Sequence, residues 1–104
     1  MGSDILSVRQ ARALGAKALI DRIPAGARVY VTIDIDGFCP SIAPGTGTPS
    51  HGGFLYYEVL EMLQEVAKRH EVVGMDLVEV APDYDHSQST SILAAQILLN
   101  FLGF

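Results

Sequence analysis

The sequence is poor in cysteine and in positive charge, and each shortage excludes a class of protein. Its single cysteine, Cys39, leaves no possibility of a disulfide within the chain, so a reducing compartment, the cytoplasm, is expected. Only 7 Lys and Arg stand against 12 Asp and Glu, giving a formal net charge of -5. Because the chain has no run of Lys and Arg, neither nucleic acid nor an anionic membrane is expected as a partner.

Long hydrophobic runs are also missing. The most apolar stretch, residues 92–104, is interrupted by Gln96 and Asn100, and it is shorter than the roughly 20 residues that span a bilayer. No basic region followed by an apolar run stands near residue 1, so no signal peptide is expected. What remains is a chain of 104 residues, 49% hydrophobic, which is enough for a single domain, or a piece of one, with a modest core.

Apolar patterning predicts an α/β fold. Helical spacing of apolar residues predicts helices over residues 5–23, 55–70 and 92–102. Two β-branched segments, residues 29–33 and 72–78, have the composition of buried strands. Strand, helix and strand in this order predict a βαβ unit with a parallel sheet, whose functional residues follow the carboxyl ends of the strands.

Two strands alone make a poor sheet. Both predicted strands are hydrophobic, and each would leave an open edge. The last helix, residues 92–102, is apolar on nearly every face, which implies burial on more than one side. We therefore expect these surfaces to pack against further protein, and a small domain that dimerises through them is the alternative.

Two acidic residues follow the first predicted strand. In extended chain Asp34 and Asp36 would point to the same side, with Ile35 turned toward the core. Neighbouring carboxylates repel each other, and a bound cation relieves that repulsion. Oxygen ligands favour a hard metal such as manganese or magnesium. The alternative is a pair of aspartates that accept hydrogen bonds from backbone N–H groups of the loop.

The residues around these aspartates resemble the signature of the ureohydrolase family, which includes agmatinases and arginases. The first segment is Thr-Ile-Asp-Ile-Asp-Gly-Phe-Cys-Pro at 32–40, followed by Ala-Pro-Gly-Thr-Gly-Thr-Pro at 43–49 and Gly-Gly at 52–53. The second is Gly-Met-Asp-Leu-Val-Glu-Val-Ala-Pro at 74–82, with Tyr-Asp at 84–85. The resemblance runs from about residue 29 to the end, and it implies the C-terminal βαβ-type part of a three-layer α/β/α arginase-like fold.

The resemblance also implies roles for individual residues. Asp34 and Asp36 match aspartates that bind two manganese ions in each complete active site of the family. Glu79 matches the catalytic glutamate that faces the guanidinium group of the substrate, and a carboxylate can pair with that planar group through two hydrogen bonds. Thr48 matches a threonine of the substrate pocket. His51 stands in a segment where the family varies, and it is either an exposed loop histidine or a residue that lines the mouth of the substrate pocket. The implied reaction uses metal-activated hydroxide to cleave a guanidino compound into urea and an amine.

Some family features are missing. The Asp-x-His-x-Asp and Gly-Gly-Asp-His segments, which supply the other metal ligands, do not occur. Cys39 and Ala81 stand where the family usually has aspartate and asparagine. Asp85-His86-Ser87 looks like a metal-binding segment, yet it follows Glu79 and is interpreted as a loop and helix cap. The chain is therefore expected to be a C-terminal fragment with an incomplete site and little or no turnover of its own.

Two other functions are compatible with parts of the pattern. A strand that ends in Asp-x-Asp-Gly also opens haloacid-dehalogenase-type phosphatases, in which Asp34 would be the nucleophile and Asp36 the general acid. A catalytically inactive module that forms an interaction or oligomer interface is the second alternative. The expected partners are a small guanidino substrate and either further copies of the chain, in a homo-oligomer, or the missing N-terminal part. The sequence does not decide whether agmatine, arginine or guanidinobutyrate is the substrate. The segment Pro-Gly-Thr-Gly-Thr-Pro, followed by Ser50 and His51, resembles agmatinases more than arginases.

Overall fold

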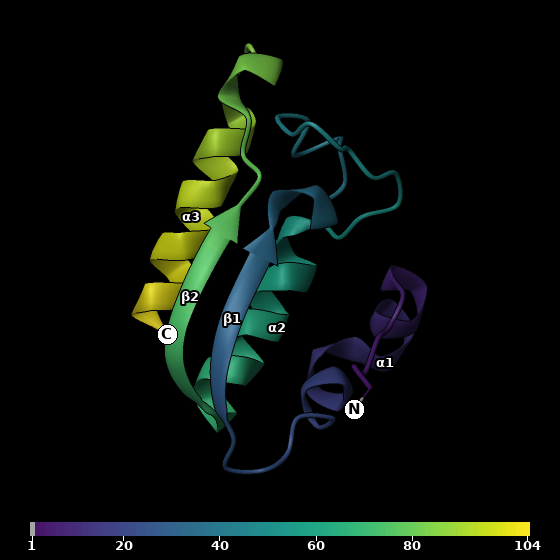
Figure 1. The fold of residues 1–104 in the computed structure, drawn as a ribbon, viewed down its shortest axis with the longest axis vertical. Coiled ribbons are helices and arrows are strands. Elements are labelled where there is room, and N and C mark those ends of the chain that lie inside the picture. Colours follow the sequence, from purple (N-terminus) through teal and green to yellow (C-terminus); the bar gives the residue numbers. More distant parts are fainter. Residues whose placement is uncertain (1) are drawn as a thin grey trace.

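The computed structural model describes residues 2–104 and confirms the predicted order of elements (Figure 1). The elements are α1 (Val8–Ile20), β1 (Arg28–Asp34), α2 (Tyr56–Arg69), β2 (Glu71–Val78) and α3 (Ser89–Gly103). A short 3-10 turn follows each strand, at Ile35–Gly37 and at Pro82–Tyr84.

The two strands form a parallel sheet, as the βαβ pattern predicts. Arg28 pairs with Glu71 at one end of the sheet, and Asp34 pairs with Val78 at the other. Both arrows in Figure 1 therefore end at the same edge, and the long loop after β1 and the segment after β2 emerge together above them. This shared edge brings the two motif segments, which are about 40 residues apart, into one region.

The core lies between one face of the sheet and helices α2 and α3. In β1 the inward positions alternate with exposed ones, as a half-covered strand requires. Ile35, just past β1, and Ile97 of α3 are completely buried, and Phe38 is 1% exposed. Full burial of an aliphatic or phenyl side chain of this size contributes about 1.5–3 kcal/mol. These contacts hold the start of the loop after β1 to the core.

The other face of the sheet is uncovered within residues 2–104. Tyr30 is 60% exposed, and Thr32 and Asp34 on the same side of β1 are also exposed. Asp76 of β2 accepts hydrogen bonds from the Tyr30 hydroxyl at 3.0 Å and from Thr32 Oγ1 at 2.6 Å. The hydrogen bond to Asp76 raises the pKa of Tyr30. This face carries polar bonds across the two strands rather than an apolar core.

Helix α3 is apolar beyond what its contacts with this chain require. Its inward side chains are buried, whereas Ile92, Leu99 and Leu102 are 56%, 70% and 75% exposed. Among residues 2–104, none of the helices combines the length and apolar character needed to cross a membrane. The exposed apolar side of α3 agrees with the sequence pattern, in which nearly every face is apolar.

Helix α1 begins later than the apolar spacing suggested. Ser7 caps it, because Ser7 Oγ accepts from Gln10 N at 3.2 Å while Gln10 Oε1 accepts from Ser7 N at 2.8 Å. Ile5 therefore lies outside the helix and is 83% exposed. Gly15 has φ +80° and kinks the helix. Local hydrogen bonds at Ser7, rather than apolar periodicity, decide where this helix starts.

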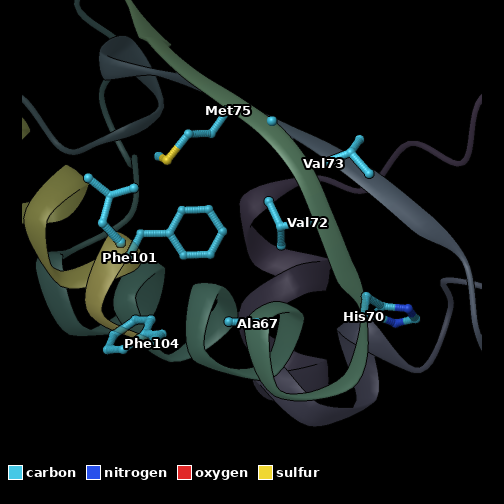
Figure 2. A pocket seen from close by; sticks show the side chains of 9 residues that line it. Ala67, His70, Val72, Val73, Met75, Phe101 and Phe104 are labelled. Atoms are coloured by element: carbon cyan, nitrogen blue, oxygen red, sulfur yellow. The ribbon is translucent and has the colours of Figure 1, made fainter.

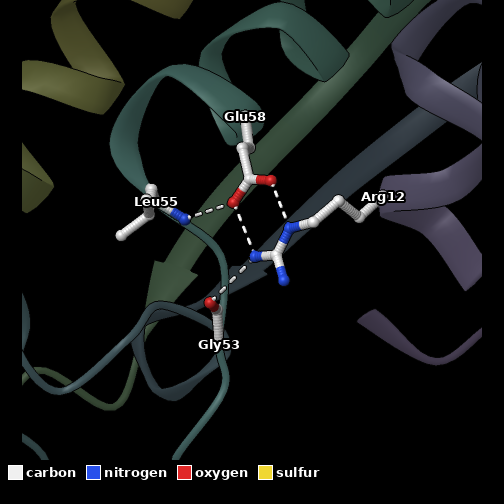
Figure 3. A network of polar contacts seen from close by, with 4 residues as sticks. All are labelled: Arg12, Gly53, Leu55 and Glu58. Atoms are coloured by element: carbon white, nitrogen blue, oxygen red, sulfur yellow. Dashed lines mark hydrogen bonds and ion pairs between the residues drawn. The ribbon is translucent and has the colours of Figure 1, made fainter. Parts of the chain in front are cut away.

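An arginine from α1 joins α2 to the loop that precedes it (Figure 3). Arg12 donates to both carboxylate oxygens of Glu58, at 2.6 and 2.8 Å, and to the carbonyl oxygen of Gly53 at 3.4 Å. Glu58 also accepts from Leu55 N at 2.9 Å, which caps the first turn of α2. The Arg12 hydrogen bonds, followed by the bond from Leu55, lower the pKa of Glu58 to about 2.

Candidate functional site

Asp34 and Asp36 lie at the carboxyl end of β1, but the chain between them is not extended. Residues 35–37 form a 3-10 turn, and Asp34 caps it by accepting a hydrogen bond from Asp36 N at 3.0 Å. The expectation of extended chain at this pair was therefore wrong, because the Asp34 side chain satisfies a backbone donor and favours a turn. Ile35 is fully buried, as predicted.

Thr48 is brought to this pair by the loop after β1. Its hydroxyl donates to Asp36 Oδ2 at 2.7 Å, although the two residues are twelve positions apart. Three predicted site residues, Asp34, Asp36 and Thr48, are thus connected by hydrogen bonds. The bonds from Asp36 N and Thr48 engage one oxygen of each carboxylate.

Glu79 follows β2 at the same edge of the sheet. Its neighbour Val78 pairs with Asp34, and the Glu79 side chain is exposed. Its backbone has φ +70°, a left-handed conformation that costs a non-glycine residue free energy. Strained backbone of this kind clusters at functional sites, where the surrounding structure holds it in place. Sequence patterning gave no sign of this conformation.

His51 is an exposed residue of the turn that ends the loop. Gly52 beside it has φ +82°, which glycine adopts without strain. Within residues 2–104, no hydrogen bond joins His51 to Asp34, Asp36 or Thr48. The fold therefore places His51 on the loop of the site without connecting it to the acidic residues.

The acidic residues form only a partial ligand set for a metal. Two carboxylates suit a hard cation, but residues 2–104 hold no group of three or more His, Cys, Asp and Glu side chains placed to bind one. A two-metal centre needs more ligands than Asp34 and Asp36 provide. Asp34 and Asp36 therefore do not by themselves make up such a centre.

The loop is anchored by contacts that sequence reasoning missed. Phe54 forms an isolated parallel bridge with Phe38, with hydrogen bonds from Cys39 N to Phe54 O at 2.8 Å and from Phe54 N to Gly37 O at 2.9 Å. Gly53 is required there, since a Cβ would lie 2.4 Å from the carbonyl carbon of Phe38. The Gly-Gly pair in the motif was the available signal for this close approach.

Cys39 is half-buried. Its thiolate is stabilised mainly by a hydrogen bond from Ser41, with a smaller contribution from the charge of Arg12, and its pKa is therefore lowered. The thiol lies beside the Phe38–Phe54 bridge, and within the described residues it forms no hydrogen bond to Asp34 or Asp36.

Asp85 serves as loop and helix cap, as predicted. Its carboxylate is 6% exposed and accepts from Ser87 and from Thr90 N, in the first turn of α3. These hydrogen bonds, with that of the Ser87 hydroxyl the largest contribution, lower the pKa of Asp85 to about 2. The N-cap position of α3 belongs to Gln88, which has φ +59°.

A pocket of about 330 Å³ lies away from these residues, near the beginning of β2 (Figure 2). Figure 2 shows Met75, Val72 and Phe101 around it, with His70 at its edge. In the described part of the chain, both ring nitrogens of His70 are buried without a hydrogen-bond partner. The pocket contains none of the predicted site residues, so the candidate site is an open edge of the sheet rather than this cavity.

Comparison with known sequences identifies the family. The family described as "Arginase family" matches residues 1–103. The chain belongs to the arginase family. Within this family it is 43% identical over 105 aligned positions to an agmatinase of Chromobacterium violaceum. The alignment covers 98% of this chain and 32% of that protein. It is 51% identical over 82 residues to an agmatinase of Bacillus subtilis, covering 77% of this chain and 28% of the relative.

Solved arginase-family structures have the same fold. A proclavaminate amidinohydrolase from Streptomyces clavuligerus superposes with a TM-score of 0.85 at 42% identity, covering 93% of this chain and 33% of that one. An arginase from Bacillus caldovelox superposes with a TM-score of 0.81 at 26% identity, covering 95% and 35%. The arginase-like fold class is confirmed, and the chain spans about a third of the length of the relatives it matches. The match favours the ureohydrolase prediction over the phosphatase alternative.

Proposed function

We propose that this chain supplies the C-terminal part of a manganese-dependent hydrolase that cleaves an agmatine-like guanidino compound to urea and an amine. Membership of the arginase family and relatives named agmatinase support this proposal. The observation that carries it is the hydrogen-bonded group of Asp34, Asp36 and Thr48 at the carboxyl edge of the sheet, with Glu79 at the same edge.

The proposed roles follow the chemistry of each side chain. Asp34 and Asp36 contribute oxygen ligands, and manganese, when bound, supplies Lewis-acid activation of water near neutral pH. Glu79 receives the guanidinium group, because an exposed carboxylate can accept two hydrogen bonds from it. Thr48 orients Asp36 on the substrate side, and His51 lines the entrance. The net charge of -5 favours the approach of a cationic substrate.

We further propose that the uncovered surfaces pack against the remaining two-thirds of an arginase-family fold, and that the assembled protein is a cytoplasmic homo-oligomer. An apolar pocket of about 230 Å³ opens along β1 beside Asp34, lined by Val31, Ile33 and side chains of α2. The exposed apolar residues of α3 offer a second surface. Both surfaces are typical of positions that neighbouring elements cover in an α/β sheet.

A graft tests the proposal directly. In the Chromobacterium violaceum agmatinase, this chain replaces the segment with which it aligns, and urea release from agmatine is measured with manganese. We expect activity in the graft and its loss on Asp36→Ala or Asp34→Ala, with Glu79→Gln raising KM strongly. A folded graft that keeps its full activity after Asp36→Ala would overturn the proposal.

The isolated chain provides the second arm. Because the described residues hold only a partial ligand set, we expect little or no urea from the purified chain with added manganese. The same deficiency favours the alternative function, an inactive interaction module. Urea release by the isolated chain, abolished by Asp36→Ala, would contradict an incomplete site. A graft that folds but is inactive with every residue intact would support the inactive module.

A further inference from the structure

A buried acidic residue, Asp85, lies outside the proposed chemistry but close to the segment of Glu79. Asp85 is 6% exposed, and its carboxylate accepts four hydrogen bonds. Ser87 N and Oγ donate to Oδ1 at 3.1 and 2.6 Å, and Thr90 N and Oγ1 donate to Oδ2 at 2.8 and 2.7 Å. Because the single hydroxyl proton of Thr90 is engaged by Asp85, the lone pairs of that oxygen remain available to an N–H donor.

That donor is the backbone of Gly45, in the loop after β1. Gly45 N donates to Thr90 Oγ1 at 2.8 Å, and this bond is buried. The carbonyl oxygen of the same glycine accepts from Ala81 N at 2.7 Å. Gly45 is therefore hydrogen-bonded through its N–H to α3 and through its carbonyl oxygen to Ala81. Ala81 stands two residues after Glu79 in the chain.

The backbone of Gly45 packs closely against α3 and the segment before it at this contact. A Cβ on Gly45 would lie 2.9 Å from Thr90 Cβ and Oγ1, and 3.0 Å from Asp85 Cβ. Real Cβ atoms do not approach this closely, so the bare backbone of Gly45 rests directly on the two side chains. The contacts of Gly45 with Asp85, Thr90 and Ala81 together form the Gly45 clamp.

We propose that Asp85 and Thr90 are positioning residues for the substrate side of the site. Through the Gly45 clamp, they fix the position of Thr48 relative to the segment that begins at Glu79. The Thr48 hydroxyl in turn donates to Asp36. They act on the geometry of the candidate site without touching the substrate. The functional part of this inference rests on the proposed guanidino hydrolysis, whereas the clamp itself does not.

Hydrogen exchange in the full chain tests the clamp without any assay of activity. Thr90→Val keeps the shape of the side chain but removes the acceptor, so exchange of the Gly45 amide should quicken about tenfold. Thr90→Ser keeps the hydroxyl and should restore slow exchange. Ile97→Val is the control, since Ile97 is fully buried in the same helix and has no part in the clamp. Thr90→Val exchange at Gly45 equal to that of Ile97→Val would overturn the clamp.

The graft described above then tests the positioning role. We expect Thr90→Val and Asp85→Asn to raise KM for agmatine about tenfold with a smaller change in kcat, and Thr90→Ser to restore KM. Ile97→Val should leave both constants unchanged. Unchanged KM in Thr90→Val, with quickened exchange at Gly45, would overturn positioning while the clamp stands. Full activity after Asp36→Ala would instead overturn the proposed function, and the exchange result would be unaffected.

Discussion

The hydroxyl of Thr48 and the carboxylate of Asp36 are joined by a hydrogen bond of 2.7 Å between residues twelve positions apart. The bond is possible because the loop after β1 returns to the strand end from which it started. Asp36 is at the same time tied to Asp34 through its backbone N–H. The loop thus places the Thr48 hydroxyl, an uncharged donor, beside Asp34 and Asp36 at the carboxyl end of β1.

Thr48→Val should weaken substrate binding in the graft. Removing the hydroxyl deletes one donor to Asp36 and frees its carboxylate to rotate, so KM for agmatine should rise about tenfold. Thr48→Ser keeps the donor and should remain close to the unaltered graft. Steady-state kinetics of urea release separate the two variants, and equal KM values for Val and Ser at position 48 would contradict the role of the hydroxyl.

Manganese should bind only weakly to the isolated chain. Asp34 and Asp36 offer carboxylate oxygens, but residues 2–104 place no third acidic, histidine or cysteine ligand beside them. Calorimetric titration should therefore show no saturation at equimolar manganese, and Asp34→Asn combined with Asp36→Asn should remove the residual binding. Tight binding of two ions per chain would show that the site is complete.

Breaking the Arg12–Glu58 pair should destabilise the fold. The pair has two short hydrogen bonds, and Glu58 also caps α2, so Arg12→Ala should measurably lower the free energy of unfolding. A double-mutant cycle with Glu58→Gln isolates their interaction during urea unfolding. Arg28→Ala is the matched control, because Arg28 and Glu71 are 3.4 Å apart and mostly exposed, and its effect should be near zero.

Stability should fall in acid because two carboxylates have lowered pKa values. The pKa of Glu58 is lowered from 4.5 to about 2, and the pKa of Asp85 is lowered from 3.8 to about 2. A lowered pKa means that the folded chain binds fewer protons than the unfolded chain, so stabilisation is present above pH 4.5 and is lost toward pH 2. Thermal melting across this range should show a smaller decline in Glu58→Gln. An unchanged decline would contradict the Glu58 contribution.

Gly53→Ala should be more destabilising than Gly47→Ala. At Gly53 the new Cβ would lie 2.4 Å from the backbone of Phe38, which is held by the bridge to Phe54. Overpacking against rigid backbone costs about 1–3 kcal/mol. At Gly47 the nearest atom is 3.7 Å away on the Tyr84 ring, an ordinary contact. Denaturant unfolding of both variants measures the difference, and equal stabilities would contradict the close approach at Gly53.

The sequence predicted the elements well and the details of the site less well. The two strands, the parallel sheet and the helix between them followed from β-branched segments and helical spacing. The relation between Asp34 and Asp36 did not, since an extended chain was expected and a 3-10 turn was found. The left-handed backbone of Glu79 could not be predicted from the sequence either, because nothing in its residue type requires that conformation.

By itself the sequence determined the α/β class, the arginase-family motifs and the edge of the sheet where those motifs meet. Helical periodicity and alternating burial along a strand repeat over a few residues, so residue types along the chain suffice to specify them. Only the tertiary structure decided that Thr48 reaches Asp36, that Arg12 joins Glu58, and that Gly45 rests on Thr90. Those contacts join residues far apart in the chain, and their geometry depends on how all the elements pack at once.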